Sequence, residues 1–276
     1  PDTAPTLITR HSLAEERRKN ITVLLAEDYV TNQKVALKQL EMAGFNVILA
    51  NNGKEAVQLF KEHVVDAVLM DIQMPVMDGY EATGLIREME KDGRHTPVIA
   101  MTAHAIKGYK EECLKAGMDD YITKPVKRDS LVSTVSRWIQ GEPQPSTYNY
   151  YTRHTREEPR DVVIDFEKGI AEFEGDSLFF FAVLDEFIKT VDKQLSHIRV
   201  ALSRDQFALI AKEAHAIKGG AANLTAAALS KAAARLEKRA KEDIPQDLAE
   251  AVAGLTQQYQ TLKEFRVNQR SEQLPG

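Results

Sequence analysis

Cysteine is almost absent from the 276-residue sequence, in which Cys113 is the single thiol. One thiol excludes an internal disulfide and a cysteine-rich metal site, and it suits a reducing compartment, so we expect a cytoplasmic location. The sequence also lacks an apolar run of the roughly 18 residues that a membrane span requires, and it has no signal-peptide core. We therefore expect no membrane contact by these residues.

An excess of basic charge is missing as well. The formal net charge is −5, and a protein without a basic field attracts nucleic acid poorly, so we expect no nucleic-acid partner. Three histidines of the first half, His63, His95 and His104, do not share the spacing of a metal site.

The composition is that of a folded globular protein, with 43% hydrophobic and 28% charged residues. A chain of 276 residues corresponds to about two domains. The chain begins with Pro1 rather than methionine, and we expect it to be a fragment of a longer protein.

Residues 20–141 alternate short apolar runs with amphipathic stretches of helical length. Strands that are buried on both faces read as continuous apolar runs, and their alternation with helices builds a parallel, doubly wound α/β sheet. We therefore predict a domain of five βα units here. The predicted strands are Ile21–Ala26, Phe45–Ala50, Asp66–Met70, Pro97–Met101 and Asp119–Ile122.

Residues 142–160 interrupt this pattern with proline-marked, polar sequence that is typical of a linker. Beyond it the strand signal stops, and residues 161–268 are predicted to form an all-α antiparallel bundle. The polar residues 1–19 are expected to be a lead-in segment. The helical patterns run over about 165–173, 177–202, 205–223, 226–243 and 246–266.

Three carboxylates follow predicted strands of the α/β domain. Glu27 and Asp28 come after the first strand, and Asp71 comes after the third. In a sheet of order 2-1-3-4-5 the first and third strands are neighbours, so these carboxylates meet at one edge, where ligands of such sheets bind. Clustered carboxylates remain ionised together only beside a cation, and hard oxygen ligands suit Mg²⁺.

The fourth and fifth strands bring two more polar side chains to the same edge. Thr102 follows the fourth strand and Lys124 follows the fifth, so a hydroxyl and an ammonium are available to contact phosphoryl oxygens. Taken singly, an aspartate after a strand is more often a helix N-cap than a nucleophile. The five residues together favour a phosphoryl-binding site.

Residues 20–140 resemble the receiver domain of two-component signalling proteins. This resemblance implies a flavodoxin-like (βα)5 fold in which Asp71 accepts a phosphoryl group. It is carried by Glu27-Asp28, Met70-Asp71, Met74-Pro75, Met77-Asp78-Gly79, Ala100-Met101-Thr102-Ala103 and Tyr121-Ile122-Thr123-Lys124-Pro125.

The same resemblance implies roles for the surrounding residues. Asp28 and Asp71 bind Mg²⁺, Glu27 reaches it through water, and the carbonyl of Gln73 completes the protein ligands. Thr102 and Lys124 contact the acyl phosphate, and Tyr121 is the aromatic residue that changes rotamer with Thr102. From their positions, Gln73 and His104 are expected to tune the attack of water on the acyl phosphate.

A histidine in the helical region stands beside small and basic residues. An apolar stripe in helix 205–223, formed by Ile210, Ala214, Ile217, Ala221 and Leu224, faces the predicted core. His215 lies off this stripe, which predicts an imidazole on the outward face with Lys218 one turn further on. A lone surface histidine usually has no function, but the two glycines at 219 and 220 weaken a helix and suggest that space is needed there.

Residues 161–266 resemble a histidine-containing phosphotransfer (HPt) domain, a four-helix bundle. The resemblance implies that His215 takes the phosphoryl group on Nε2 and that Lys218 lies near the phosphate. The matching residues are Gly175-Asp176, Ala214-His215-Ala216-Ile217-Lys218-Gly219, Ala222-Asn223-Leu224 and Leu236-Glu237.

The two resemblances together predict a phosphorelay module from the C-terminal part of a hybrid sensor histidine kinase. An upstream kinase core would be the donor, a receiver domain on a response regulator would be the final acceptor, and an anchor in the inner membrane would belong to the parent protein. Without a kinase core, the chain is not expected to phosphorylate itself from ATP.

Two other functions predict different sequence features. A docking module that does not relay phosphate predicts a damaged site, yet the acceptor residues are intact. A haloacid-dehalogenase-type phosphatase would need an acid two residues after Asp71, where Gln73 stands.

Overall fold

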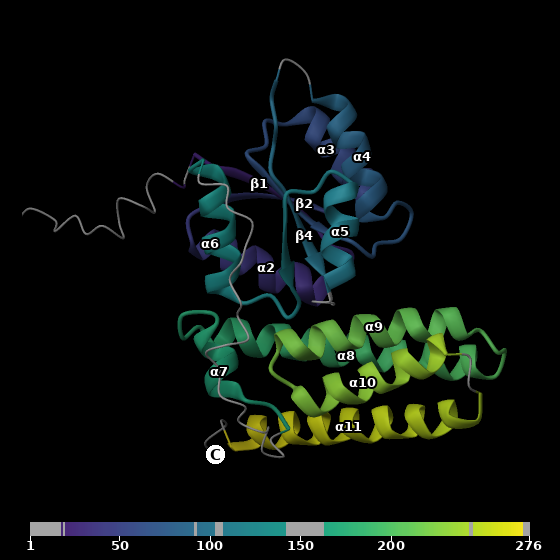
Figure 1. Cartoon of the computed structure of the whole chain (residues 1–276). Helices are drawn as coiled ribbons and strands as arrows, with labels where there is room; N and C mark the ends of the chain where they lie inside the picture. Colours follow the sequence, from purple (N-terminus) through teal and green to yellow (C-terminus); the bar gives the residue numbers. More distant parts are fainter. Residues whose placement is uncertain are drawn as a thin grey trace, which may run out of the picture. The chain divides into compact units, whose positions relative to one another are not determined.

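The computed structural model of the chain describes residues 18, 20–90, 93–102, 107–141, 163–242 and 245–272. It divides into two units, Pro1–Tyr148 and Asn149–Gly276, and each is described by itself (Figure 1). The predicted linker 142–160 and His104 lie outside the described residues, as does nearly all of the lead-in 1–19. No helix among the described residues is long and apolar enough to cross a membrane.

A five-stranded parallel sheet is the centre of the first unit, and its strand order is β2-β1-β3-β4-β5. The strands are β1 (Thr22–Ala26), β2 (Asn46–Ala50), β3 (Ala67–Asp71), β4 (Val98–Thr102) and β5 (Asp120–Thr123). The predicted α/β class and strand order are therefore confirmed.

The observed strands begin one residue later than predicted and three of them end one residue later. Asp71 pairs with Met101 in the β3–β4 ladder, and Thr102 pairs with Thr123 in the β4–β5 ladder. Both polar residues are thus the last residues of their strands rather than the first residues of the loops. The apolar run stops before the hydrogen-bonded ladder does, because a side chain at the strand end can be polar while its backbone still pairs.

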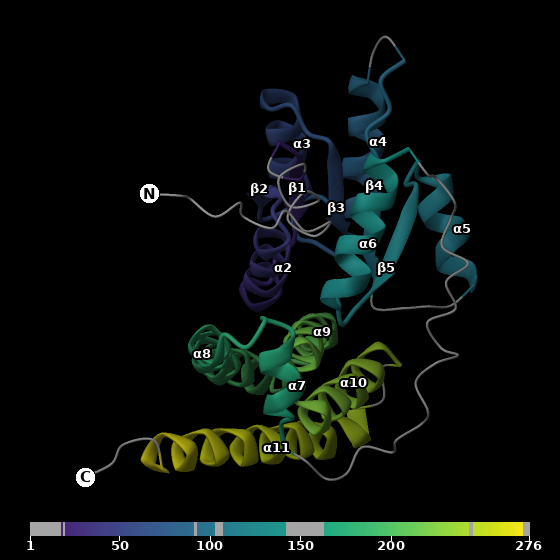
Figure 2. The ribbon, with the colours of Figure 1, turned by 90° about the vertical axis from the view of Figure 1, so that its left-hand side faces the viewer.

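Helices cover both faces of the sheet (Figure 2). The helices are α2 (Val30–Met42), α3 (Gly53–Glu62), α4 (Gly79–Met89), α5 (Lys107–Lys115) and α6 (Arg128–Ile139). Successive strand residues point to opposite faces, so Leu24 and Val68 enter the core under α3, α4 and α5. Val23 and Leu69 enter the core under α2 and α6.

Two glycines bring the loop after β3 close to its neighbours. The Gly79 amide donates to the Ile72 carbonyl at 2.9 Å, and the Gly53 amide donates to the Met77 carbonyl at 3.1 Å. A Cβ atom on Gly79 would collide with the backbone oxygen of Asp71. This close approach holds the backbone that carries Asp71.

Gly79→Ala is therefore expected to destabilise the α/β unit by about 2–3 kcal/mol, because backbone rather than a flexible side chain blocks the added methyl group. Urea unfolding followed through the fluorescence of Trp138, the single tryptophan of the sequence, measures this unit alone. Gly84→Ala in the same helix is the control, since nothing lies within 4 Å of a Cβ there, and it should be neutral or stabilising by up to about 1 kcal/mol. Equal unfolding curves for the two variants would contradict the role of Gly79.

The second unit is helical. Four long helices each contact two others, and the short α7 packs beside α8 through Gly169 and Phe180. The predicted stripe of α9 is wholly buried, which confirms the bundle. Its helices are α7 (Phe166–Ala171), α8 (Ser177–Leu202), α9 (Phe207–Asn223), α10 (Ala227–Lys241) and α11 (Pro245–Glu272).

Candidate functional site

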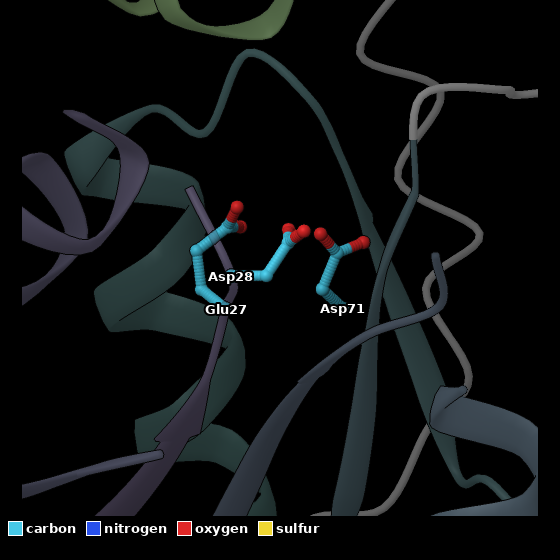
Figure 3. Close-up of side chains that lie close together, drawn as sticks. All are labelled: Glu27, Asp28 and Asp71. Carbon is cyan, nitrogen blue, oxygen red and sulfur yellow. The ribbon is translucent and has the colours of Figure 1, made fainter. Parts of the chain in front are cut away.

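Three carboxylates converge at the carboxyl edge of the sheet, as predicted. Glu27 and Asp28 follow β1, and Asp71 ends the neighbouring strand β3. One carboxylate oxygen from each lies within 4.8 Å of the others, and Figure 3 shows the three side chains side by side. Glu27 and Asp71 are 1% and 4% exposed, so the cluster is largely withdrawn from water.

Lys124 joins two of these carboxylates. Its Nζ lies 2.6 Å from Glu27 Oε2 and 2.6 Å from Asp71 Oδ2. Although burial disfavours its charge, the carboxylates of Glu27 and Asp71 hold the pKa of Lys124 above its ordinary value. The ammonium therefore stays charged and bridges the two acids.

The negative charges around Asp71 nevertheless outnumber the positive charge of Lys124. Burial is the largest effect and raises the pKa of Asp71. The ammonium of Lys124 lowers this pKa, whereas the carboxylates of Glu27 and Asp28 raise it, and the result is a pKa of about 7 instead of 3.8. One ammonium thus does not balance three carboxylates in a site of low dielectric. A small divalent cation with oxygen ligands fits this donor set and would favour the ionised form of Asp71.

The remaining predicted residues of this site lie around Asp71. Thr102 is 5% exposed, and its carbonyl accepts from the Lys124 amide at 2.7 Å. The Gln73 amide donates to Asp71 Oδ1 at 3.3 Å. Tyr121 is half-buried beside Ala100 of β4.

His215 in the helical unit is held by a neighbouring helix. Its Nδ1 lies 2.8 Å from Oε1 of Glu237, which comes from α10. The prediction of an outward-facing imidazole was only partly right, because the side chain is 22% exposed. The sequence places His215 off the core stripe of its own helix, but it does not reveal that α10 covers that side.

Glu237 is a functional candidate for which the sequence suggested no role. Lys218 donates to its Oε2 at 2.6 Å and Lys241 donates to its Oε1 at 2.7 Å. Burial opposes its charge, but the hydrogen bonds from His215, Lys218 and Lys241 lower the pKa of Glu237 well below its ordinary value. Lys218, which was expected beside a phosphate, here neutralises Glu237.

The ionised Glu237 determines which ring nitrogen of His215 is free. A carboxylate only accepts hydrogen bonds, so Nδ1 must carry the proton. In the neutral imidazole, Nε2 then keeps its lone pair and is the nucleophilic atom. The arrangement agrees with the expected attack through Nε2.

Comparison with known proteins gives two family matches. Residues 23–136 match the model described as response regulator receiver domain, and residues 182–265 match the Hpt domain.

Individual proteins resemble the chain over one or both regions. The sensor protein GacS of Pseudomonas syringae pv. syringae is 30% identical over 228 residues, which cover 81% of this chain and 25% of that protein. Hybrid signal transduction histidine kinase I of Dictyostelium discoideum is 42% identical over 137 residues, covering 46% of this chain and 8% of the kinase. The chain thus spans a quarter or less of the length of these relatives.

One solved structure similar to the α/β unit is the receiver domain of sensor histidine kinase PA1611 from Pseudomonas aeruginosa PAO1, which has a magnesium ion in its active site cleft. It is 44% identical, with a TM-score of 0.41, and the match covers 44% of this chain and 98% of that one.

Proposed function

The chain contains a response regulator receiver domain followed by an Hpt domain, and from this premise we propose that Asp71 and His215 hold the same phosphoryl group in succession. The receiver domain is proposed to span residues 20–141 and the Hpt domain residues 161–268, joined by a linker at 142–160. The observation that supports this function best is the buried cluster of Glu27, Asp28 and Asp71 beside Lys124.

The first transfer loads Asp71. A carboxylate oxygen of Asp71 forms a bond to phosphorus while the bond from phosphorus to the donor imidazole nitrogen breaks. The donor histidine keeps the proton on its other ring nitrogen, so it leaves as a neutral ring. The transition state is loose and in-line, and the site contributes position and positive charge rather than a strong base. Lys124, which lies 2.6 Å from Asp71 Oδ2, is placed to pair with a phosphoryl oxygen.

The residues proposed to hold Mg²⁺ are Asp28 and Asp71 directly, Glu27 through water, and Gln73 through its carbonyl. When bound, Mg²⁺ would neutralise charge on the phosphoryl oxygens. The Thr102 hydroxyl would contact another of these oxygens, and Tyr121 would change rotamer with Thr102 after loading.

The second transfer moves the group to a histidine. Nε2 of His215 forms a bond to phosphorus while the bond from phosphorus to the Asp71 oxygen breaks and the carboxylate is restored. Nδ1 keeps its proton against Glu237 Oε1, 2.8 Å away, so the ring can bear positive charge as the new bond forms. Lys218 lies within reach of Glu237 and would help to balance the phosphoryl charge.

The proposed partners lie outside this chain. A histidine kinase core, in the same parent protein or in a partner, would supply the phosphoryl group, and the receiver domain of a response regulator would accept it from His215. A docking module that does not relay phosphate is the alternative.

Labelling with an upstream kinase core and radioactive ATP tests this function. The parent chain should become labelled in the presence of the kinase core and should remain unlabelled with ATP and Mg²⁺ alone. A docking module would bind the kinase core without taking label, and that result would overturn the proposed relay.

Glu237→Gln is expected to slow phosphoryl transfer through His215 by roughly 10- to 100-fold, because a hydrogen bond to a charged group contributes about 1.5–3 kcal/mol. The measurement is single-turnover phosphoryl transfer between two variants of the full chain. The donor variant keeps Asp71 as its only acceptor, and the receiving variant keeps His215 as its only acceptor.

Glu213→Gln is a matched control for this prediction. Glu213, on the same helix α9 as His215, has its Oε1 3.0 Å from Nδ1 of His197 on α8, so the same type of carboxylate–histidine contact is removed away from the acceptor. Its transfer rate should equal that of the parent. Equal slowing of both variants would show that the effect is not specific to His215.

A further inference from the structure

The Glu27 carboxylate is held on both of its oxygens. Asn32 donates from Nδ2 to Oε1 at 2.9 Å, and the Tyr29 amide donates to the same oxygen at 3.3 Å. Lys124 donates to the other oxygen, Oε2, at 2.6 Å. The carboxylate is therefore fixed in one rotation, with Oε1 turned toward the start of α2 and Oε2 turned toward Lys124.

Asn32 is buried, like the acid that it contacts. Asn32 is 6% exposed and Glu27 is 1% exposed, so bulk water does not replace this hydrogen bond if it is lost. Without Asn32, Oε1 keeps only the longer hydrogen bond from the Tyr29 amide, at 3.3 Å, and a buried charged group that loses a hydrogen bond is destabilised. Glu27 would then turn to recover a partner.

The side-chain amide of Asn32 is a neutral hydrogen-bond donor. It orients the carboxylate without cancelling its charge, whereas a lysine or arginine would neutralise it. Lys124 already brings a positive charge to Glu27, and Asn32 adds a second side-chain donor without adding positive charge, so the cluster with Asp28 and Asp71 keeps the net negative charge that attracts a divalent cation.

We infer that Asn32 is a positioning residue for the divalent-cation site: it fixes the rotation of the Glu27 carboxylate and thereby increases the affinity for Mg²⁺. This inference rests on the proposed function, because it assumes that the cluster of Glu27, Asp28 and Asp71 binds Mg²⁺. In this role Asn32 acts through Glu27 and is not itself a metal ligand.

The neighbouring Gln33 has a different role. Its Nε2 donates to the backbone carbonyl of Glu27 at 2.6 Å and to Asn51 Oδ1 at 3.0 Å. Gln33 therefore joins the main chain after β1 to the Asn51 side chain after β2, and Asn32 alone of the two holds the Glu27 side chain.

The experiment is a calorimetric titration of the full chain with MgCl₂, without any phosphoryl donor. We expect the Kd for Mg²⁺ to rise about tenfold in Asn32→Ala, which is the lower end of the effect of losing a partner that orients a metal ligand. Unfolding curves without Mg²⁺, read through Trp138, show whether the variant is folded. If Asn32→Ala is unfolded, the titration is done with Asn32→Leu instead, because leucine fills more of the space that the asparagine side chain occupies.

Gln39→Ala is the matched control. Gln39 is also a buried amide of α2, at 1% exposure, seven residues further along the same helix face, and its Oε1 has no hydrogen-bond partner. It lies about 10 Å from Asn32 along the helix axis. Its Mg²⁺ affinity should equal that of the parent.

A double-mutant cycle separates orientation of Glu27 from a general structural effect. In a Glu27→Gln background, Asn32→Ala should cause no further loss of Mg²⁺ affinity, because the carboxylate that it orients is gone. An unchanged Kd in Asn32→Ala, or an equal loss with and without Glu27, would overturn the inference while leaving the metal site intact. A parent chain that does not bind Mg²⁺ would overturn the proposed metal site and this inference together.

Discussion

His215→Gln is expected to leave loading of Asp71 intact and to stop onward transfer to a response regulator. Glutamine has no nucleophilic nitrogen, so the group that must attack phosphorus is removed. Loss of a nucleophile costs at least about a thousandfold in rate, which places onward transfer below detection. The measurement is the amount of label that reaches a separate response regulator receiver domain after the kinase core has loaded the variant.

His197→Gln provides the control for this variant. His197 also has its Nδ1 3.0 Å from a carboxylate, Glu213 Oε1, but it is much more exposed, at 62% of its side chain. Onward transfer should be unchanged. If His197→Gln stopped transfer and His215→Gln did not, the assignment of the acceptor would be wrong.

Asp71→Asn is expected to prevent loading altogether. An amide cannot form the acyl phosphate, and no other carboxylate of the cluster ends a strand in the same position, since Glu27 and Asp28 follow β1. The loss should again reach at least about a thousandfold. Label from the kinase core should then appear neither at position 71 nor at His215.

Asp78→Asn is the matched control for loading. Asp78 follows Asp71 in the same loop and caps α4 by accepting from the Glu81 amide at 2.9 Å. Asparagine caps a helix about as well as aspartate, so this change removes one nearby carboxylate and keeps the fold. Loading of Asp78→Asn should match the parent, and a loss equal to that of Asp71→Asn would contradict a specific acceptor.

The raised pKa of Asp71 predicts a dependence of stability on pH in buffer without Mg²⁺. In the unfolded chain this carboxyl ionises near pH 3.8, and in the folded protein its pKa is about 7. Between these values the folded state binds a proton that the unfolded state has released, so the free energy of unfolding decreases as pH rises from about 4 to about 7. The stability associated with the protonated form is complete below pH 4 and lost above pH 7.

Asp71→Asn should lack this contribution, because it has no charge to bury. Urea unfolding, followed through Trp138 fluorescence at several pH values, measures the free energy of unfolding. This free energy should decrease less with rising pH in the variant than in the parent, so the variant becomes the more stable protein near pH 8. Parallel pH profiles for the two proteins would contradict the raised pKa.

The architecture of both domains follows from sequence patterns. Continuous apolar runs such as that before Asp71 mark strands buried on both faces, and the spacing of Ile210, Ala214 and Ile217 marks a helix facing a core. The convergence of Glu27 and Asp71 was also predictable, because parallel neighbouring strands end at the same edge. The strand ends were displaced by a residue, because polarity marks where burial changes and not where the ladder of hydrogen bonds ends.

Contacts between elements were not predictable in the same way. Glu237 lies 22 residues after His215 on the next helix, and the sequence does not determine the rotation of one helix against another. Asn32 resembles any polar residue in a first helical turn, and only the structure brings its amide to Glu27. Once the structure shows that such a polar side chain is buried, a hydrogen-bond partner for it can be expected.

The most direct test of the relay is the order in which Asp71 and His215 become labelled. Rapid-quench samples from the kinase core, the parent chain and radioactive ATP can be divided between acid and base, because phosphohistidine is lost in acid and aspartyl phosphate is lost in base. We predict that base-labile label on Asp71 appears first and acid-labile label on His215 follows, and that Asp71→Asn shows neither. Labelling of His215 in the Asp71→Asn protein would contradict the relay.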